Sequence, residues 1–282
     1  MILSLQGCMA VGKTTAVRYL QENAPYIHIS YEDNTDIIEE VKRRGLDKNR
    51  YEDYLEIQKL WLRKEVLRYE KAIRHPCSIM DFGAEEIEFY TLNYPKSIGE
   101  DWEVEDALNK ELSEVRKCLP DRILFLDASD EVLRFHKQHD DTRARNFFEH
   151  HLQHMMPLKR EWFRKKENVD WLMVDDLSVE EMCRKVQDWC DACISSKEQI
   201  TRIERYETLM REAELLMEEP CGEDAGELRR KMEALEAYYG SEEWKKDFAD
   251  DEVGLLPAGL KRGVLSEDGI YNLLERYRER NG

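Results

Sequence analysis

The chain has 282 residues, and its 43 Lys and Arg against 61 Asp and Glu give a formal net charge of −18 at pH 7. Hydrophobic residues make up 41% and aromatic residues 10% of the chain, which is enough to fill a core and excludes wholesale disorder. The acidic balance argues against general nucleic-acid binding and against attraction to anionic lipid, because both of those surfaces are negatively charged.

Targeting and membrane segments are not expected. The longest apolar runs, such as Ile123–Leu126, are too short to cross a bilayer. Met1–Leu5 has the pattern of a buried strand and not of a leader. The seven cysteines are an odd number and are scattered from Cys8 to Cys221, which is not typical of a disulfide framework. We therefore expect a cytoplasmic protein.

Residues 1 to about 195 alternate short apolar runs with long amphipathic stretches. The strand-sized runs are Ile2–Gln6, Tyr26–Ser30, Ser78–Asp81, Ile123–Asp127 and Trp171–Val174. Strands that alternate with helices favour a parallel sheet covered on both faces. We therefore predict a doubly wound α/β domain over residues 1–195.

A phosphate-binding motif follows the first strand. Residues 7–14, Gly-Cys-Met-Ala-Val-Gly-Lys-Thr, fit the pattern G-x-x-x-x-G-K-[ST] without a mismatch. The glycines let the backbone wrap around an anion, and the next helix adds its N-terminal dipole. Lys13 is predicted to reach the β- and γ-phosphates of a nucleotide, and the Thr14 hydroxyl to ligate Mg²⁺. The predicted nucleotide-binding residues are Gly7, Ala10, Val11, Gly12, Lys13, Thr14 and Thr15.

Two acids follow the second strand, at the sheet edge where open α/β sheets bind ligands. Glu32 or Asp33 would take the proton of a substrate hydroxyl; we prefer Asp33, and a solvated loop acid is an equally good explanation. Tyr54, Gln58 and Trp61 share one side of the next helix. They would cover the phosphoryl acceptor, although an aromatic stripe at this spacing is more often core.

The third and fourth strands both end in a carboxylate, the usual source of an Asp that holds Mg²⁺. We predict Asp81 for this role, because in the doubly wound order its strand lies beside the first strand. For Asp127, helix capping together with Ser129 or Asp130 is the stronger interpretation.

Arg143 and Arg145 follow the helix after the fourth strand. Guanidinium groups on a loop there would fold over the transferring phosphoryl group, neutralise its charge and exclude water. The alternative is an ordinary solvated charge run. No Asn-Lys-x-Asp motif is present, which argues against a GTPase switch.

The pattern changes near residues 194–197, and no strand-like run follows. Two apolar seams with spacings of 3 and 4 flank a break at Pro220–Gly222, which predicts an antiparallel helical hairpin. The seams are Ile203, Tyr206, Met210, Ala213 and Met217, then Ala225, Leu228, Met232, Leu235 and Tyr239. A last helix is predicted to begin after Ser266 as N-cap. Residues 198–282 would thus form an all-helical domain.

The first part of the chain resembles the P-loop kinases of the nucleoside and nucleotide kinase group. The resemblance rests on Gly7–Thr14, Asp33, Asp81, Arg143-Ala144-Arg145, and the segment from Arg143 through Glu149 to Trp162, which is similar to the lid and following helix of deoxynucleoside kinases. It covers about residues 1–195 and implies a five-stranded parallel sheet, ATP with Mg²⁺, and phosphoryl transfer to a small-molecule acceptor. The catalytic residues would be Lys13, Asp33, Arg143 and Arg145, and the Mg²⁺ ligands Thr14 and Asp81.

One departure bears on the acceptor. Residues 81–86 are Asp-Phe-Gly-Ala-Glu-Glu, where deoxynucleoside kinases usually carry a Glu-Arg-Ser type motif and thymidylate kinases Asp-Arg. Chloramphenicol phosphotransferase-like and zeta-toxin-like kinases share the same general plan. An antibiotic or nucleotide-sugar acceptor therefore stays open beside a nucleoside or nucleotide.

The C-terminal part is similar to a family of small bacterial helical domains of unknown function. The similarity rests on Arg202–Tyr206, Tyr238–Trp244 and Gly263–Tyr271. It implies an interaction or regulatory module, so residues 198–282 would bind a protein partner or a second copy of the chain. The rival to the kinase is thus a nucleotide-dependent binding protein that signals through this domain.

Overall fold

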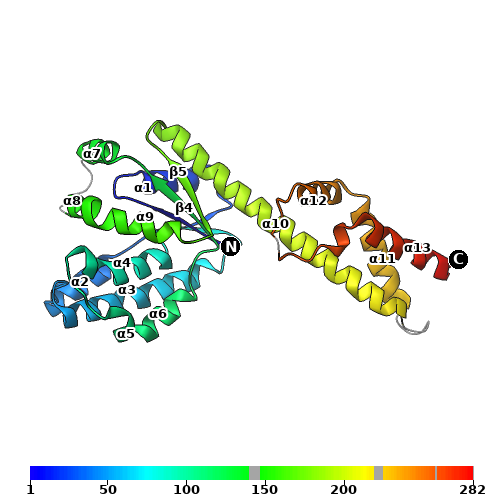
Figure 1. Ribbon diagram of the computed structural model, residues 1–282, viewed down its shortest axis with the longest axis horizontal. Helices are drawn as coiled ribbons and strands as arrows, with labels where there is room; N and C mark the ends of the chain where they lie inside the picture. The colour runs from blue at the N-terminus through cyan, green and yellow to red at the C-terminus, as the bar shows by residue number, and fades with distance from the viewer. Residues whose placement is uncertain (140–146, 219–224, 258, 282) are drawn as a thin grey trace. The chain divides into compact units, whose positions relative to one another are not determined.

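The computed structural model describes residues 1–139, 147–218, 225–257 and 259–281 (Figure 1). The chain divides into two compact units, Met1–Asp191 and Ala192–Gly282. Helix α10 (Val179–Glu218) begins in the first unit and ends in the second. Residues 194–197, where the sequence pattern changes, lie within this helix. The change of pattern therefore marks new packing partners and not the end of a helix.

The first unit is built on a five-stranded sheet with the order β2-β3-β1-β4-β5. Its strands are β1 (Ile2–Gly7), β2 (His28–Ser30), β3 (Ser78–Asp81), β4 (Arg122–Asp127) and β5 (Val169–Met173). All neighbouring strands are parallel, and the register sets Leu5 opposite Asp81 and Gly7 opposite Leu126. The predicted fold class is confirmed, and β3 lies beside β1 as expected.

Helices cover both faces of this sheet. They are α1 (Lys13–Asn23), α2 (Thr35–Arg44), α3 (Tyr51–Ala72), α4 (Ala84–Ser97), α5 (Val104–Ala107), α6 (Asn109–Arg116), α7 (Asp130–Gln138), α8 (Phe148–His150) and α9 (Met156–Arg164), with a π-helical stretch η1 (His151–Met155) between the last two. Figure 1 shows α3, α4 and α9 on one side of the sheet, and α1 with the start of α10 on the other. Leu3, Ile79 and Phe125 of the central strands are fully buried between these layers.

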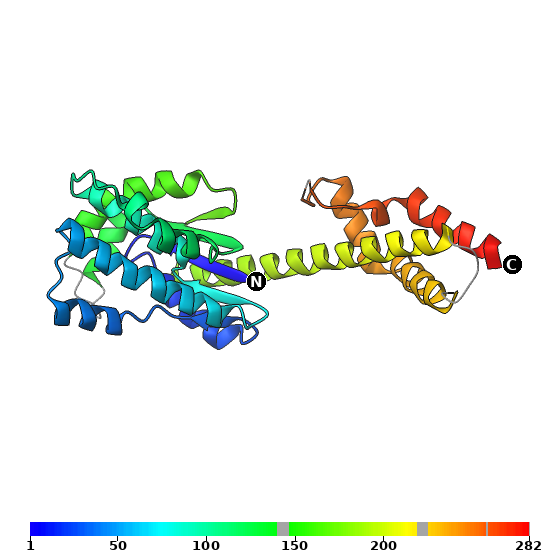
Figure 2. The same cartoon turned by 90° about the horizontal axis from the view of Figure 1, so that it is seen from below.

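The second unit is helical over its described residues. After α10 it contains α11 (Ala225–Tyr239), α12 (Glu242–Glu252), a short 3₁₀ turn η2 (Gly263–Leu265) and α13 (Glu267–Asn281) (Figure 2). Tyr206 of α10 stacks on Tyr238 of α11 at 3.8 Å, and Glu212 pairs with Lys231 at 2.6 Å. Because the partner numbers run in opposite directions, these helices are antiparallel, as the matched seams predict. The break at Pro220–Gly222 lies outside the described residues.

Serine side chains cap two helices of this unit, α13 and α12. Ser266 Oγ accepts a hydrogen bond from the Gly269 backbone N–H at 3.2 Å, so Ser266 caps α13 as predicted. Helix α12 was not predicted; its N-cap is Ser241, whose side chain accepts from the Trp244 N–H. Along the part of the chain that the structure describes, no helix combines the length and the apolar character that a membrane crossing requires.

Candidate active site

The loop between β1 and α1 is held in a tight turn. Gly7, Ala10 and Gly12 have φ angles of 134°, 68° and 106°, in the left-handed region that favours glycine. A Cβ atom on Gly7 would lie 2.2 Å from the carbonyl oxygen of Leu126 on the neighbouring strand. The loop therefore requires glycine at its first position. It leads straight into α1 at Lys13, whose N-terminal backbone N–H groups can bind an anion.

Two buried ammonium groups lie beneath this loop. Lys13 Nζ donates to the carbonyl oxygens of Gly7 and Cys8, at 3.0 and 2.7 Å. Lys159 Nζ, from α9, donates to the Gly7 carbonyl oxygen at 3.2 Å and pairs with Glu86 Oε2 at 2.7 Å. Burial, and next the charge of Lys159, lower the pKa of Lys13 to about 8. Because Glu86 neutralises Lys159, Lys13 supplies the positive charge that suits a polyanion in a chain that is acidic overall.

The ring of Phe82 contacts Lys13 beneath the phosphate-binding loop. The φ angle of Phe82 is 62°, and its ring lies 4.6 Å from Lys13 Nζ, within cation–π range. Arg68 of α3 donates to the carbonyl oxygens of Asp81 and Phe82, at 3.0 and 2.6 Å, and to that of Ser30 at 2.9 Å. One guanidinium group thus ties together the ends of β2 and β3 and stabilises the strained residue Phe82.

Thr14 and Asp81 meet at the end of the loop. Thr14 Oγ1 lies 3.3 Å from Asp81 Oδ2, because β3 pairs with β1 and ends opposite Leu5, near the point where β1 leads into the loop. Among the described residues, the buried Asp81 Oδ1 atom has no hydrogen-bond partner. A hydroxyl and a carboxylate with an unpartnered oxygen are ligands that Mg²⁺ prefers. These two residues therefore fit a magnesium ion at the phosphate-binding loop.

Asp127, the other strand-end acid, is engaged elsewhere. Both of its carboxylate oxygens accept from Arg160 of α9, at 2.9 to 3.1 Å. Its Oδ1 also accepts from the Ala128 N–H. The cap of α7 is Ser129, whose hydroxyl accepts from the Val132 N–H. Asp127 therefore stabilises the packing of α9 on the sheet and leaves Asp81 as the acid beside the loop.

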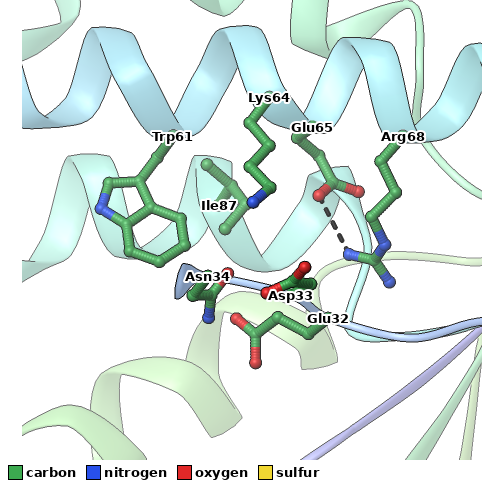
Figure 3. Close-up of a pocket in the computed structure, with 8 residues that line it drawn as sticks. All are labelled: Glu32, Asp33, Asn34, Trp61, Lys64, Glu65, Arg68 and Ile87. Carbon is green, nitrogen blue, oxygen red and sulfur yellow. Dashed lines mark hydrogen bonds and ion pairs between the residues drawn. The ribbon is translucent and has the colours of Figure 1, made fainter. Parts of the chain in front are cut away.

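Glu32 and Asp33 take different positions after β2. Asp33 Oδ1 accepts from the N–H and hydroxyl of Thr35, at 3.2 and 2.9 Å, and these bonds lower the pKa of Asp33. Figure 3 shows both carboxylates on the loop opposite Trp61 and Arg68 of α3. Of the two, Glu32 also lines the larger cavity, which Gly7 lines as well. Desolvation raises the pKa of Glu32, although the residue as a whole is exposed. The position of Glu32 therefore fits the predicted proton acceptor better than that of Asp33, the residue that the sequence analysis prefers.

A cavity of about 380 Å³ opens beside the loop. Its lining residues are Gly7, Met9, Glu32, Asn34, Lys48, Tyr54, Ile57, Gln58, Trp61, Phe82, Glu86, Ile87, Tyr90, Tyr94 and His151. Tyr54 and Gln58 are 1% and 6% exposed. Both are therefore buried core residues that also line the cavity. Gln58 Oε1 accepts from Thr91 Oγ1 at 2.8 Å, which fixes the amide between α3 and α4. The predicted acceptor-covering residues Tyr54, Gln58 and Trp61 all line this cavity.

Several site residues were missed by the sequence analysis: Arg68, Phe82, Glu86, His151 and Lys159. Lys159 lies between the buried residues Met156 and Phe163, so a lysine on an apolar helix face was the available signal. The others belong to no motif. Arg143 and Arg145, the predicted lid, lie outside the described residues, between α7 and α8.

Known proteins resemble the two parts of the chain separately. A family model described as a domain of unknown function, DUF4298, matches residues 203–280. The comparison with curated proteins finds no match.

Solved structures resemble the N-terminal part. Two structures of deoxyadenosine kinase from M. mycoides, one with dCMP and dCDP and one with dCTP, are 13% identical and cover 68% of this chain and 100% of theirs, with TM-scores of 0.52 and 0.51. A thymidylate kinase from Candida albicans is 13% identical and covers 68% of this chain and 91% of its own, with a TM-score of 0.46. The expected resemblances of the two parts, to this kinase group in fold and to a helical domain family, are confirmed.

Proposed function

We propose that the chain is an ATP- and Mg²⁺-dependent kinase that transfers a phosphoryl group to the hydroxyl or phosphate of a small metabolite, with nucleosides and nucleotides as the leading class. One observation carries the proposal: the loop with Lys13, Thr14 and Asp81 opens onto a cavity with aromatic walls. Its volume of about 380 Å³ is in the range of small-molecule sites. The kinase-like fold of the first unit supports the same reaction class.

Each residue has a role in this proposal. Lys13 and the N-terminus of α1 bind the phosphates of ATP, and Thr14 and Asp81 hold Mg²⁺, which neutralises phosphate charge when bound. Glu32 takes the proton of the incoming hydroxyl. Arg143 and Arg145, which lie outside the described residues, would neutralise the charge of the transferring phosphoryl group. The second unit provides a surface for a protein partner or a second copy.

The test is transfer of label from ATP. The full chain is incubated with γ-labelled ATP and a metabolite extract, and labelled products are separated and identified by mass. We expect a labelled organic product, lost at least a hundredfold in Lys13→Ala because the phosphates lose their cation. Lys165→Ala is the matched control, since Lys165 is exposed and pairs only locally with Glu161.

Two outcomes would contradict the proposal. Transfer that persists in Lys13→Ala would remove the loop from the reaction. Free phosphate as the sole labelled product of the unsubstituted chain would favour a nucleotide-dependent binding protein.

A further inference from the structure

Side chains from two helices hold the carbonyl groups at the start of the phosphate-binding loop. Lys13 of α1 donates to the carbonyl oxygens of Gly7 and Cys8, and Lys159 of α9 donates to that of Gly7 as well. No peptide bond among the described residues is cis, and in a trans peptide the next N–H points away from the carbonyl oxygen. Holding these two carbonyl groups therefore turns the N–H groups that follow them to the other side of the loop, where an anion can bind.

The proposed function gives Lys13 a second set of acceptors. Its ammonium group has three N–H donors, and it bonds to the carbonyl oxygens of Gly7 and Cys8 at 3.0 and 2.7 Å. ATP would bring the β- and γ-phosphates that a lysine at this position of the loop reaches. Three donors cannot serve two carbonyl groups and two phosphates at once, so Lys13 must release one carbonyl group when ATP binds.

Gly7 is the residue whose carbonyl group Lys13 can release without leaving a buried acceptor unpaired. Gly7 and Cys8 are both buried, and a buried carbonyl oxygen without a donor is costly. The Gly7 oxygen keeps Lys159 as a donor at 3.2 Å, whereas the side-chain donor that the structure shows for Cys8 is Lys13 itself. Lys13 can therefore turn two donors to the phosphates and keep its shorter bond, the one to Cys8.

Lys159 is fixed in the core of the first unit. It is 0% exposed, and its ammonium group pairs with the Glu86 carboxylate at 2.7 Å, which balances its charge. Three aromatic rings lie 5.4 to 6.0 Å from the same nitrogen, within cation–π range; they belong to Phe82, Phe125 and Phe163. A fully covered ammonium group does not touch a phosphate of ATP, so any effect of Lys159 on the reaction is exerted through the loop.

We propose that Lys159 is a positioning residue, which holds the Gly7 carbonyl group alone when Lys13 turns to the phosphates of ATP. This inference rests on the proposed kinase function. In the free protein both ammonium groups bond to the Gly7 oxygen. With ATP bound, Lys159 keeps that bond, and Lys13 retains only Cys8 among the carbonyl groups. The loop thus has one shape in both states, and Glu86 keeps Lys159 in place for the exchange.

The first experiment measures nucleotide affinity without Lys159. Glu86→Gln and Lys159→Met are combined in the full chain, which removes both charges of the buried pair and leaves the net charge unchanged. Calorimetry with Mg²⁺ and β,γ-imido-ATP, which does not transfer its γ-phosphoryl group, gives the Kd. We expect the Kd to rise about tenfold, because the bound state lacks one hydrogen bond. Glu161→Gln with Lys165→Met is the matched control: this ion pair is exposed at the end of the same helix, and its removal should leave the Kd unchanged.

The second experiment separates the exchange from a general distortion of the loop. In a chain with Lys13→Met, the Gly7 carbonyl group depends on Lys159 in the free and the bound state alike. Adding Glu86→Gln with Lys159→Met should then change the Kd by less than about twofold. Lys159→Gln in place of Lys159→Met keeps a side-chain N–H donor, so it should restore part of the affinity in the chain that retains Lys13. Urea unfolding checks that each variant is folded, and the Lys159→Gln form, with an expected rise of about threefold, replaces one that is not.

The outcomes distinguish the exchange from the proposed function. A Kd that rises only where Lys13 is present supports the exchange. An unchanged Kd in the variant without the buried pair, or the same fold-change with and without Lys13, overturns this inference alone. Failure of the unsubstituted chain to bind β,γ-imido-ATP overturns the proposed function and this inference with it.

Discussion

Lys13 and Lys159 donate to one shared acceptor, the carbonyl oxygen of Gly7, at 3.0 and 3.2 Å. The two ammonium groups come from helices more than a hundred residues apart in the chain. Glu86 neutralises Lys159, whereas Lys13 has backbone carbonyl groups as its hydrogen-bond acceptors. Lys13 is therefore available to an anionic ligand, and burial together with the nearby charge of Lys159 lowers its pKa.

We expect ATP binding to be coupled to proton uptake by Lys13. Its pKa of about 8 lies below the usual value of about 10.4, so at pH 8 about half of the free protein has a neutral Lys13. Bound phosphates favour the ammonium form and raise the pKa, so binding takes up about half a proton at pH 8 and close to none at pH 6. Calorimetry in buffers of different ionisation enthalpy measures this uptake. Lys13→Arg, which stays charged, should abolish it, and equal enthalpies in all buffers at pH 8 would contradict the prediction.

Asp81→Asn is expected to raise the Mg²⁺ concentration for half-maximal transfer at least tenfold. The substitution removes the negative charge that lies 3.3 Å from the Thr14 hydroxyl but keeps the shape of the side chain. ATP binding in the presence of a chelator should be unaffected. Asp127→Asn serves as the contrast: it weakens the bidentate pair with Arg160, so it should lower the melting temperature without changing the Mg²⁺ dependence. Identical Mg²⁺ curves for Asp81→Asn and the unsubstituted chain would exclude Asp81 as a ligand.

The sequence could predict what depends on local backbone and strand order. The phosphate-binding loop needs glycine at positions 7 and 12, and Asp81 follows from β3 lying beside β1. The sequence could not predict which of Glu32 and Asp33 faces the cavity, because two neighbouring loop carboxylates differ only in the direction in which their side chains point. His151 was missed for a related reason: a π-helical stretch changes the helical periodicity on which face assignment depends.

Glu32→Gln is expected to lower kcat by about a hundredfold or more, since a general base contributes about 10² to 10⁴ in rate. Desolvation raises the pKa of Glu32, so activity should fall on the acid side at a pH above that of an ordinary carboxylate, and Glu32→Gln should remove this limb. Asp33→Asn should change kcat less than threefold, because among the described residues the carboxylate of Asp33 accepts its hydrogen bonds from Thr35 of its own loop. A loss of activity in Asp33→Asn alone would restore the assignment of Asp33.

Gly7→Ala is expected to destabilise the first unit by more than about 3 kcal/mol. The new Cβ would lie 2.2 Å from the Leu126 carbonyl oxygen, at a φ angle of 134°. Gly45→Ala is the matched control, because Gly45 also has a positive φ, 64°, but a Cβ there would meet nothing within 4 Å. Its cost should be about 1 kcal/mol, from backbone strain alone. Urea unfolding of both variants measures the difference, and equal costs would show that the close contact with β4 does not matter.

Three helices of the second unit, α10, α11 and α12, meet at one buried carboxylate, and we expect Asp247→Ala to destabilise this unit by about 3–5 kcal/mol. Asp247 of α12 is 0% exposed. Its carboxylate accepts two bonds from Arg202 of α10, at 2.9 and 2.5 Å, one from Gln199 of α10 at 3.0 Å, and one from Tyr238 of α11 at 2.7 Å. Removing the carboxylate leaves the Arg202 charge and the Tyr238 hydroxyl without their partner.

Asp250→Ala is the matched control for this prediction. Asp250 also lies on α12 and accepts from Gln199 at 2.8 Å, the same amide that donates to Asp247. Because Asp250 is only partly buried and Gln199 keeps its bond to Asp247 in the variant, its loss should cost less than about 1 kcal/mol. Urea unfolding followed by fluorescence of Trp244, which packs in the same core, reports on this unit, with the other tryptophans replaced by phenylalanine. Equal midpoints for the two variants would show that Asp247 does not hold the three helices together. ATP affinity should be unchanged in both, because the phosphate-binding loop and its lysines belong to the first unit.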